Sequence, residues 1–215
     1  MMRNSLFSTG LAAVLSLFVC YTAFSSAGTE AVEKLLKSKI DNVLGILSQK
    51  EVTEEAKRQQ VMDVINPVIN FSLMAKLTLG KENWGRLTPD ERTRFVDLFV
   101  ERLKTSYLNK ITLYSDQTVT YGKAAEESGK VQVPTYLETK DGRIEIIYKF
   151  YSTDGQWLVY DVEIDGVSFI KSYRSQFDEV LRNGTVDDLF AQLKKAGDNE
   201  TEQDNASQPV PPAGK

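Results

Sequence analysis

The chain has 215 residues, of which 41% are hydrophobic and 26% are charged, and its formal net charge is −4. It contains no histidine and one cysteine, Cys20, which excludes a histidine general base, a Ser-His-Asp triad, a Cys-His nucleophile and histidine-ligated zinc. The acidic balance argues against nucleic acid as a partner, because phosphate contacts require clustered lysine and arginine. The length is sufficient for one compact core or two small ones.

Residues 1–27 have the pattern of a secretory signal peptide. Arg3 supplies the positive charge, residues 11–19 form an apolar stretch that is too short to span a bilayer, and small residues precede Gly28. We therefore expect export and cleavage near Ala27, with a lipoprotein or an uncleaved membrane anchor as alternatives. Without Cys20 the mature chain cannot form a disulfide, so burial of apolar side chains must stabilise it.

Apolar residues recur at helical spacing through most of the first half of the chain. This periodicity predicts a helix over residues 32–47, followed by a second helix that Thr53 caps and Pro67 ends. Asn70 can cap a short third helix that stops near Gly80. The first half of the chain is therefore predicted to be helical.

The best-defined helix start lies at residues 88–91. Thr88 can cap the helix, Pro89 fits the first turn, and Glu91 can complete a capping box. We expect this helix to run to about Tyr114. Its apolar positions are broader than a single stripe, which predicts burial over more than half of its circumference.

Residues 117–165 change to a period of two, which predicts an antiparallel sheet of about four strands. A two-residue turn at residues 141–142 would pair Leu137 with Ile146 and Val133 with Phe150. For the next hairpin we favour a three-residue loop, 153–155, over a two-residue turn at 154–155, because the longer loop places the apolar side chains of both strands on one face.

The last part of the sequence is helical and then polar. Ser168 can cap a helix that ends near Gly184, and a second short helix follows over residues 186–193. From Gly197 the chain has almost no apolar residue, which predicts a disordered tail over residues 197–215. The predicted organisation is a signal peptide, one α+β domain over residues 28–196, and the tail.

Two groups of polar residues could carry chemistry. Asp161, Glu163 and Asp165 alternate along a strand, where one could serve as a general base, although a solvated strand face explains them more simply. Ser168 and Lys171 have the Ser-x-x-Lys spacing of some acyl-transfer enzymes, but an N-cap serine and an exposed lysine fit the helix better. We therefore assign no catalytic residue and no metal ligand.

Aromatic and aliphatic side chains are concentrated on elements that should face one another. Periodicity alone cannot distinguish a filled core from a hollow one, so both interpretations stay open at this point. A cation beside a hydroxyl, at Arg174 and Tyr173, could contact a phosphate, or Arg174 could simply be a surface residue.

Several spaced motifs resemble those of the MlaC, or toluene-tolerance, family. They occur in the family order and cover residues 29–193, nearly all of the mature chain. Asn70 stands where the family usually has Asp, and both residues can cap a helix. The motifs are the run DVEIDGVSFIKSYRSQF at residues 161–177, NFSLMA at residues 70–75, and the dispersed residues Leu79, Gly80, Trp84, Thr88, Pro89, Arg92, Phe95, Phe99, Thr105, Ser106 and Tyr107.

The resemblance implies a periplasmic phospholipid-binding protein that acts in the maintenance of outer-membrane lipid asymmetry. Its partners would be phospholipid, an inner-membrane ABC transporter with an MCE-domain subunit, and an outer-membrane lipoprotein complex. The implied fold is a curved antiparallel sheet packed against helices, with an apolar lipid cavity between them. Such a carrier needs no cofactor, because the phospholipid is its cargo. A cone-fold isomerase or dehydratase and an exported chaperone or adaptor are the alternatives.

For this cavity we expect the apolar face of the sheet to meet the helices across a gap that lipid tails fill. We expect Arg174 to lie at the mouth, near the lipid head group. The expected lipid-binding residues are Phe71, Met74, Trp84, Phe95, Phe99, Leu103, Tyr107, Val133, Ile146, Tyr148, Phe150, Tyr160, Phe169 and Tyr173.

Overall fold

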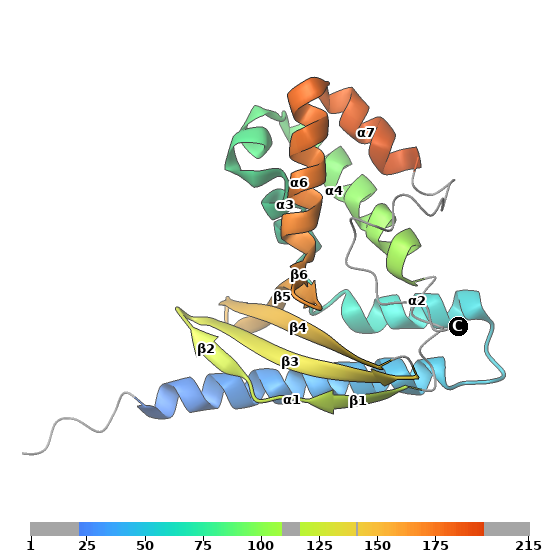
Figure 1. The fold of residues 1–215 in the computed structure, drawn as a ribbon, viewed down its shortest axis with the longest axis vertical. Coiled ribbons are helices and arrows are strands. Elements are labelled where there is room, and N and C mark those ends of the chain that lie inside the picture. Colours follow the sequence, from blue (N-terminus) through green and yellow to red (C-terminus); the bar gives the residue numbers. More distant parts are fainter. Residues whose placement is uncertain (1–21, 109–116, 141, 196–215) are drawn as a thin grey trace, which may run out of the picture.

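The computed structural model describes residues 22–108, 117–140 and 142–195, and the side chains from residue 28 onward. Within these residues, six α-helices, one π-helical turn and six strands form an α+β fold (Figure 1). The elements in chain order are α1 (Thr22–Leu47), α2 (Glu54–Ile65), α3 (Phe71–Arg86), α4 (Pro89–Leu103), the π turn η1 (Lys104–Leu108), β1 (Thr118–Tyr121), β2 (Ala125–Glu127), β3 (Lys130–Thr139), β4 (Gly142–Thr153), β5 (Gln156–Ile164), β6 (Val167–Ser168), α6 (Phe169–Asn183) and α7 (Val186–Lys195).

The sheet is antiparallel throughout, with the order β1-β3-β4-β5-β6, and β2 also pairs with β3. The short strands β2 and β6 are additions to the roughly four strands expected from the sequence. Their short length explains why the sequence does not predict them, because three and two residues are too few to establish a period of two.

The first hairpin differs from its predicted register. Thr139 pairs with Gly142, so Leu137 lies opposite Ile144 and Val133 opposite Tyr148. The predicted pairing was therefore wrong by two residues, because the strand begins at Gly142 rather than after it. Side chains alternate with a period of two, so this shift leaves the same side chains on the same face of the sheet.

The second hairpin has the two-residue turn, not the favoured three-residue loop. Asp154 and Gly155 both have positive φ angles, 49° and 74°, as a twist-matched hairpin turn requires. Phe150 therefore pairs with Val159, but a β-bulge follows and Tyr148 pairs with Val162. The bulge places the apolar side chains of β4 and β5 on one face of the sheet. This is the arrangement for which the longer loop is favoured from the sequence.

Helices α3, α4, α6 and α7 form a bundle in the upper part of Figure 1, and the sheet and α1 lie below it. The caps are those expected: Thr88 and Glu91 make a reciprocal capping box on α4, and Ser168 accepts from the Lys171 backbone N–H at the start of α6. The described part of the fourth helix ends in the π turn, so the expected extension to Tyr114 lies outside the described residues.

The bundle core is filled by aromatic rings. Phe95, Phe99, Tyr173 and Phe177 are each at most 2% exposed. The rings of Phe99 and Tyr173 lie edge to face at a centroid distance of 5.3 Å, and those of Phe95 and Phe177 at 5.6 Å. These contacts have the spacing of favourable aromatic pairs, so this part of the molecule is a packed core.

Helix α1 lies along the sheet and is anchored at its centre and at its C-terminal end (Figure 1). Val32 and Leu36 pack in a buried cluster with residues of β3, β4 and β5, whereas Leu47 packs with Val61 and Met62 of α2. Between Leu36 and Leu47, no residue of α1 is fully buried. The stretch of α1 between Leu36 and Leu47 therefore lacks the tight packing found on either side of it.

Most of the predicted signal peptide and the predicted tail lie outside the described residues, so their boundaries stay predictions. No helix in the described part of the chain is long and apolar enough to cross a bilayer.

Candidate functional site

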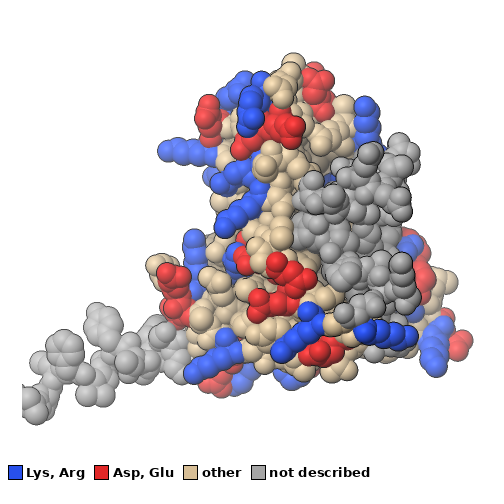
Figure 2. All heavy atoms as spheres, in the orientation of Figure 1, with Lys and Arg blue, Asp and Glu red and all other residues tan. Residues whose placement is uncertain are grey.

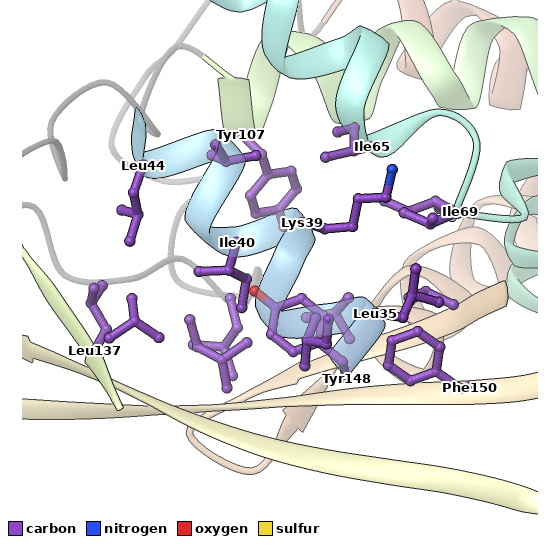
Figure 3. Close-up of a pocket in the computed structure, with 18 of the residues that line it drawn as sticks. Leu35, Lys39, Ile40, Leu44, Ile65, Ile69, Tyr107, Leu137, Tyr148 and Phe150 are labelled. Carbon is purple, nitrogen blue, oxygen red and sulfur yellow. The ribbon is translucent and has the colours of Figure 1, made fainter. Parts of the chain in front are cut away.

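A cavity of about 310 Å³ lies between α1, the sheet and the connection from α2 to α3 (Figure 3). Its surface is almost entirely apolar. Twenty residues line it, and the residues are Leu35, Leu36, Lys39, Ile40, Val43, Leu44, Leu47, Ile65, Val68, Ile69, Tyr107, Val119, Leu137, Ile146, Tyr148, Phe150, Val159, Val162, Ile164 and Phe169.

Helix α1 forms one side of the cavity through its apolar stripe. Leu36, Ile40, Val43, Leu44 and Leu47 recur at intervals of three and four residues, so they project from one face of the helix. Two polar contacts hold α1 to β1 and to the β1–β2 connection: the Glu33 carboxylate accepts from the Ala124 backbone N–H at 2.6 Å, and Tyr121 donates to Asp41 at 3.1 Å. The helix is thereby kept beside the sheet without filling the space beneath residues 37–46.

The sheet forms the opposite side. Ile146, Tyr148 and Phe150 alternate along β4 and face the cavity, as their period of two predicts. On β5, Val159 and Val162 both line the cavity although they are three residues apart. The β-bulge makes this possible, because it inserts one extra residue between them.

The connection between α2 and α3 closes one side of the cavity and is fixed to β5. The Val159 backbone N–H donates to Val68 O at 2.8 Å, and the Asn70 backbone N–H donates to Val159 O at 2.9 Å. The Asn70 side chain also caps α3 by accepting from the Leu73 N–H at 2.9 Å. These bonds orient Val68 and Ile69 toward the cavity, where both are lining residues.

Two aromatic residues connect the cavity to the bundle. Tyr107 of η1 and Phe169 of α6 stack with a centroid distance of 4.7 Å, and both line the cavity. Burial raises the pKa of Tyr148 to about 12 and also raises that of Tyr107. Burial therefore favours the neutral form of both phenols over the phenolate.

The structure brings together five of the fourteen side chains that the sequence analysis expected to contact lipid. Figure 3 labels three of these five, and they converge on the space beneath α1. The five lining residues are Tyr107, Ile146, Tyr148, Phe150 and Phe169.

The other nine do not line this cavity. Val133 is 1% exposed on the correct face of the sheet, but it packs beneath Val32 and Leu36. Tyr160 is the bulge residue and lies edge-on to Tyr151, 6.0 Å between ring centroids. The remaining seven belong to the bundle core or pack against it: Phe71, Met74, Trp84, Phe95, Phe99, Leu103 and Tyr173.

Arg174 is not at the cavity either. Its guanidinium donates to the backbone carbonyl of Leu77 in α3, with the Nε–O distance at 3.0 Å. That carbonyl is available because α3 loses helical geometry at Gly80, where φ is 70° and ψ is 170°. Arg174 therefore connects α6 to α3 and does not line this cavity, and its expected head-group role stays a prediction.

Asp161 is not on a solvated strand face, so that interpretation of the sequence was wrong for this residue. The side chain is buried, with 4% of the residue exposed, and accepts from Ser168 Oγ at 2.8 Å, Lys149 Nζ at 3.2 Å and the Ile170 N–H at 3.2 Å. Burial disfavours the Lys149 ammonium, but Glu163 and Asp161 outweigh this and raise the Lys149 pKa. The network fixes the start of α6 to β5, so it has a structural role.

The cavity residues that sequence reasoning missed lie mainly on α1. The helical stripe over residues 32–47 was recognised, but it was interpreted as ordinary core because stripe and cavity lining have the same periodicity. Lys39 carried no signal at all, since a lysine in an amphipathic helix is usually solvated. The described residues contain no cluster of three or more metal-ligating side chains.

The sequence model of the MlaC family, described as MlaC protein, matches residues 37–195. The chain belongs to the MlaC family. It is 24% identical over 210 residues to the toluene tolerance protein ttg2D of Pseudomonas putida, covering 93% of this chain and 98% of that protein. It is 22% identical over 159 residues to the intermembrane phospholipid transport system binding protein MlaC of Haemophilus influenzae, covering 71% and 70% of the two chains.

A solved structure shares the fold of this chain. The phospholipid-binding protein of Ralstonia solanacearum, determined in complex with a phospholipid, superposes with a TM-score of 0.69 at 23% sequence identity. The match covers 76% of this chain and 95% of that one. The similarity to this solved structure therefore confirms the α+β architecture inferred from the sequence.

Proposed function

We propose that this MlaC-family protein is a non-enzymatic periplasmic carrier that moves phospholipid between the inner and outer membranes. The observation that carries the proposal is the apolar cavity between α1 and the sheet. A phospholipid-binding name for one relative and a phospholipid complex of a fold neighbour support the same ligand class. In this proposal the acyl chains occupy the cavity, with Ile146, Tyr148 and Phe150 against them.

The energetic need for such a cavity follows from the hydrophobic effect. Two acyl chains contain about 30 methylenes, and each costs roughly 0.8 kcal/mol in water, so an unaccompanied lipid would pay more than ~20 kcal/mol on leaving a membrane. An apolar cavity removes most of this cost without any covalent step. A carrier therefore needs an apolar surface and a cavity that acyl chains can enter, rather than catalytic groups.

An enzyme is the less favoured alternative because Asp161, the candidate general base, is hydrogen-bonded outside the cavity. Asp161 does not line the cavity, and its two carboxylate oxygens accept bonds from Ser168, Lys149 and the Ile170 backbone. Lys171, the other catalytic candidate, is exposed. Both groups support a structural interpretation and leave the cavity with an almost entirely apolar lining.

The finer details rest on the family resemblance. We propose export by a signal peptide cleaved near Ala27, followed by exchange of lipid with an ABC transporter carrying an MCE-domain subunit and with an outer-membrane lipoprotein complex. N-terminal sequencing of the exported protein tests the cleavage. A mature chain that begins at Met1 would contradict it.

Mass spectrometry of an organic extract tests the ligand class. The mature protein, purified after export, should release about one phospholipid per chain, and it should transfer that lipid between vesicles that are otherwise separate. A protein that contains no lipid, and that does not acquire any from phospholipid vesicles, would contradict the carrier proposal.

A further inference from the structure

The apolar cavity contains one charged residue among the twenty described residues that line it, Lys39 of α1. Figure 3 shows its side chain extending from α1 toward the side of the cavity where Ile65 and Ile69 lie. Lys39 is half-buried, so its aliphatic stem is part of the lining. The ammonium therefore lies at the edge of the cavity, on the side of Ile65 and Ile69.

Other lysines of α1 behave differently. Lys34 pairs with Glu30 at 2.5 Å, and Lys37 pairs with Asp41 at 2.9 Å. Both pairs are on the exposed side of the helix, at i,i+4 spacing. Within the part of the chain that the structure describes, no hydrogen bond or ion pair is formed by the Lys39 ammonium, although its helix neighbours are paired.

An ammonium beside apolar side chains is costly unless a hydrogen-bonding anion accompanies it. No carboxylate of the described residues lines this cavity. A ligand with apolar chains and an anionic group satisfies both parts of the surface: the chains cover Ile40, Tyr148 and their neighbours, and the anionic oxygens accept from Lys39. A phosphate suits this geometry, because lysine binds phosphate as a point charge.

We propose that Lys39 is the head-group anchor of the cavity and binds the phosphate of a phospholipid. This inference rests on the proposed carrier function and adds a selectivity: the cavity prefers a phospholipid to an uncharged diacylglycerol with the same chains. The head group then lies at the edge formed by α1 and the α2–α3 connection, rather than beside Arg174. Arg174 is already bonded to Leu77.

Competition between two lipids tests the proposal. Lipid-free protein is incubated with vesicles that contain phosphatidylglycerol and diacylglycerol of identical chains, and native mass spectrometry measures the ratio of the two bound forms. Lys39→Met should lower this ratio about tenfold, because one charge-assisted bond is lost. Lys39→Arg should keep most of the preference. Lys39→Gln provides a second neutral variant whose side chain remains polar, in case Lys39→Met does not fold.

Lys34→Met is the matched control, since it removes a lysine from the exposed face of the same helix and should leave the ratio unchanged. An unchanged ratio in both neutral Lys39 variants would overturn the anchor while leaving the carrier function intact. Failure of the wild-type protein to bind either lipid would instead contradict the carrier function itself. Displacement of bound phospholipid by inorganic phosphate alone would identify a free-phosphate site and would also overturn the anchor.

Discussion

The helical bundle and the space beneath α1 are built from similar residues but packed in opposite ways. In the bundle, Phe95 and Phe99 are completely buried, and each contacts other rings at edge-to-face or stacked distances. Beneath α1, Ile40 and Leu44 line a cavity and are only partly buried. The difference teaches that apolar content does not determine whether a core is filled; the distance between the elements does.

Surface charge does not distinguish the two regions. Figure 2 shows Lys, Arg, Asp and Glu distributed over both parts of the visible surface. The joint between the parts is polar and buried, at Asp161 and Lys149. The bundle thus acts as a stable platform connected to the sheet, whereas the cavity between the sheet and α1 is free to accept a ligand.

The largest effect should come from opening a hole in the filled core. Phe99→Ala should reduce the free energy of unfolding by about 3–5 kcal/mol, because the ring is fully buried among Phe95, Tyr173 and Phe177. Leu44→Ala, at the cavity, should cost about 1 kcal/mol in the lipid-free protein, because few atoms contact that side chain. Urea unfolding of both variants measures the contrast, and equal losses would remove the distinction between the two regions.

Breaking the polar joint should have the next largest effect. Asp161→Ala leaves Ser168, Lys149 and the Ile170 N–H without their shared acceptor, so it should destabilise the protein by about 2–3 kcal/mol. Lys171→Ala is the control at an exposed position. Lipid transfer per folded molecule should remain in both variants. Loss of transfer by folded Asp161→Ala would revive the enzymatic interpretation.

Enlarging a side chain distinguishes the hollow region at Leu44 from the filled region beneath Val32 and Leu36. Val133→Trp should overpack the cluster beneath Val32 and Leu36 and cost about 1–3 kcal/mol. Leu44→Trp should leave the lipid-free protein within ~1 kcal/mol of wild type, because the cavity accepts the added atoms. Its content of co-purified lipid should fall.

The two measurements for these variants are urea unfolding of the lipid-free form and lipid per protein by mass spectrometry. A Leu44→Trp protein with normal lipid content would place the acyl chains elsewhere in the molecule. A Val133→Trp protein of unchanged stability would show that the hollow region extends beneath Val32 and Leu36.

The last effect appears only at alkaline pH and leaves stability at neutral pH unchanged. Burial raises the pKa of Tyr148 from 10.0 to about 12, so the fold favours the neutral phenol. This contribution is complete below pH 10 and is lost as the pH rises from 10 to about 12. Urea unfolding at several pH values in this window should show a smaller decline for Tyr148→Phe than for wild type. Identical declines would mean that the Tyr148 phenol is solvated.

Local structure was determined by the sequence. The caps at Thr88, Asn70 and Ser168 form as expected, because each depends on a side chain and the backbone N–H groups of the next turn. The alternation along β4 predicted which side chains share a face, and a register error of two residues did not disturb it. The family resemblance, which depends on residue order, was confirmed by the match over residues 37–195.

Only the tertiary structure decided which apolar face meets a partner. The stripe of α1 and the aromatic positions of α4 have the same helical periodicity, yet α4 is packed and the stretch of α1 between Leu36 and Leu47 is not. The bulge at Tyr160, the break in α3 at Gly80 and the pairing of Val159 with the α2–α3 connection set the distances between elements. Periodicity records the direction in which a side chain points, whereas a cavity depends on how far away the next surface lies.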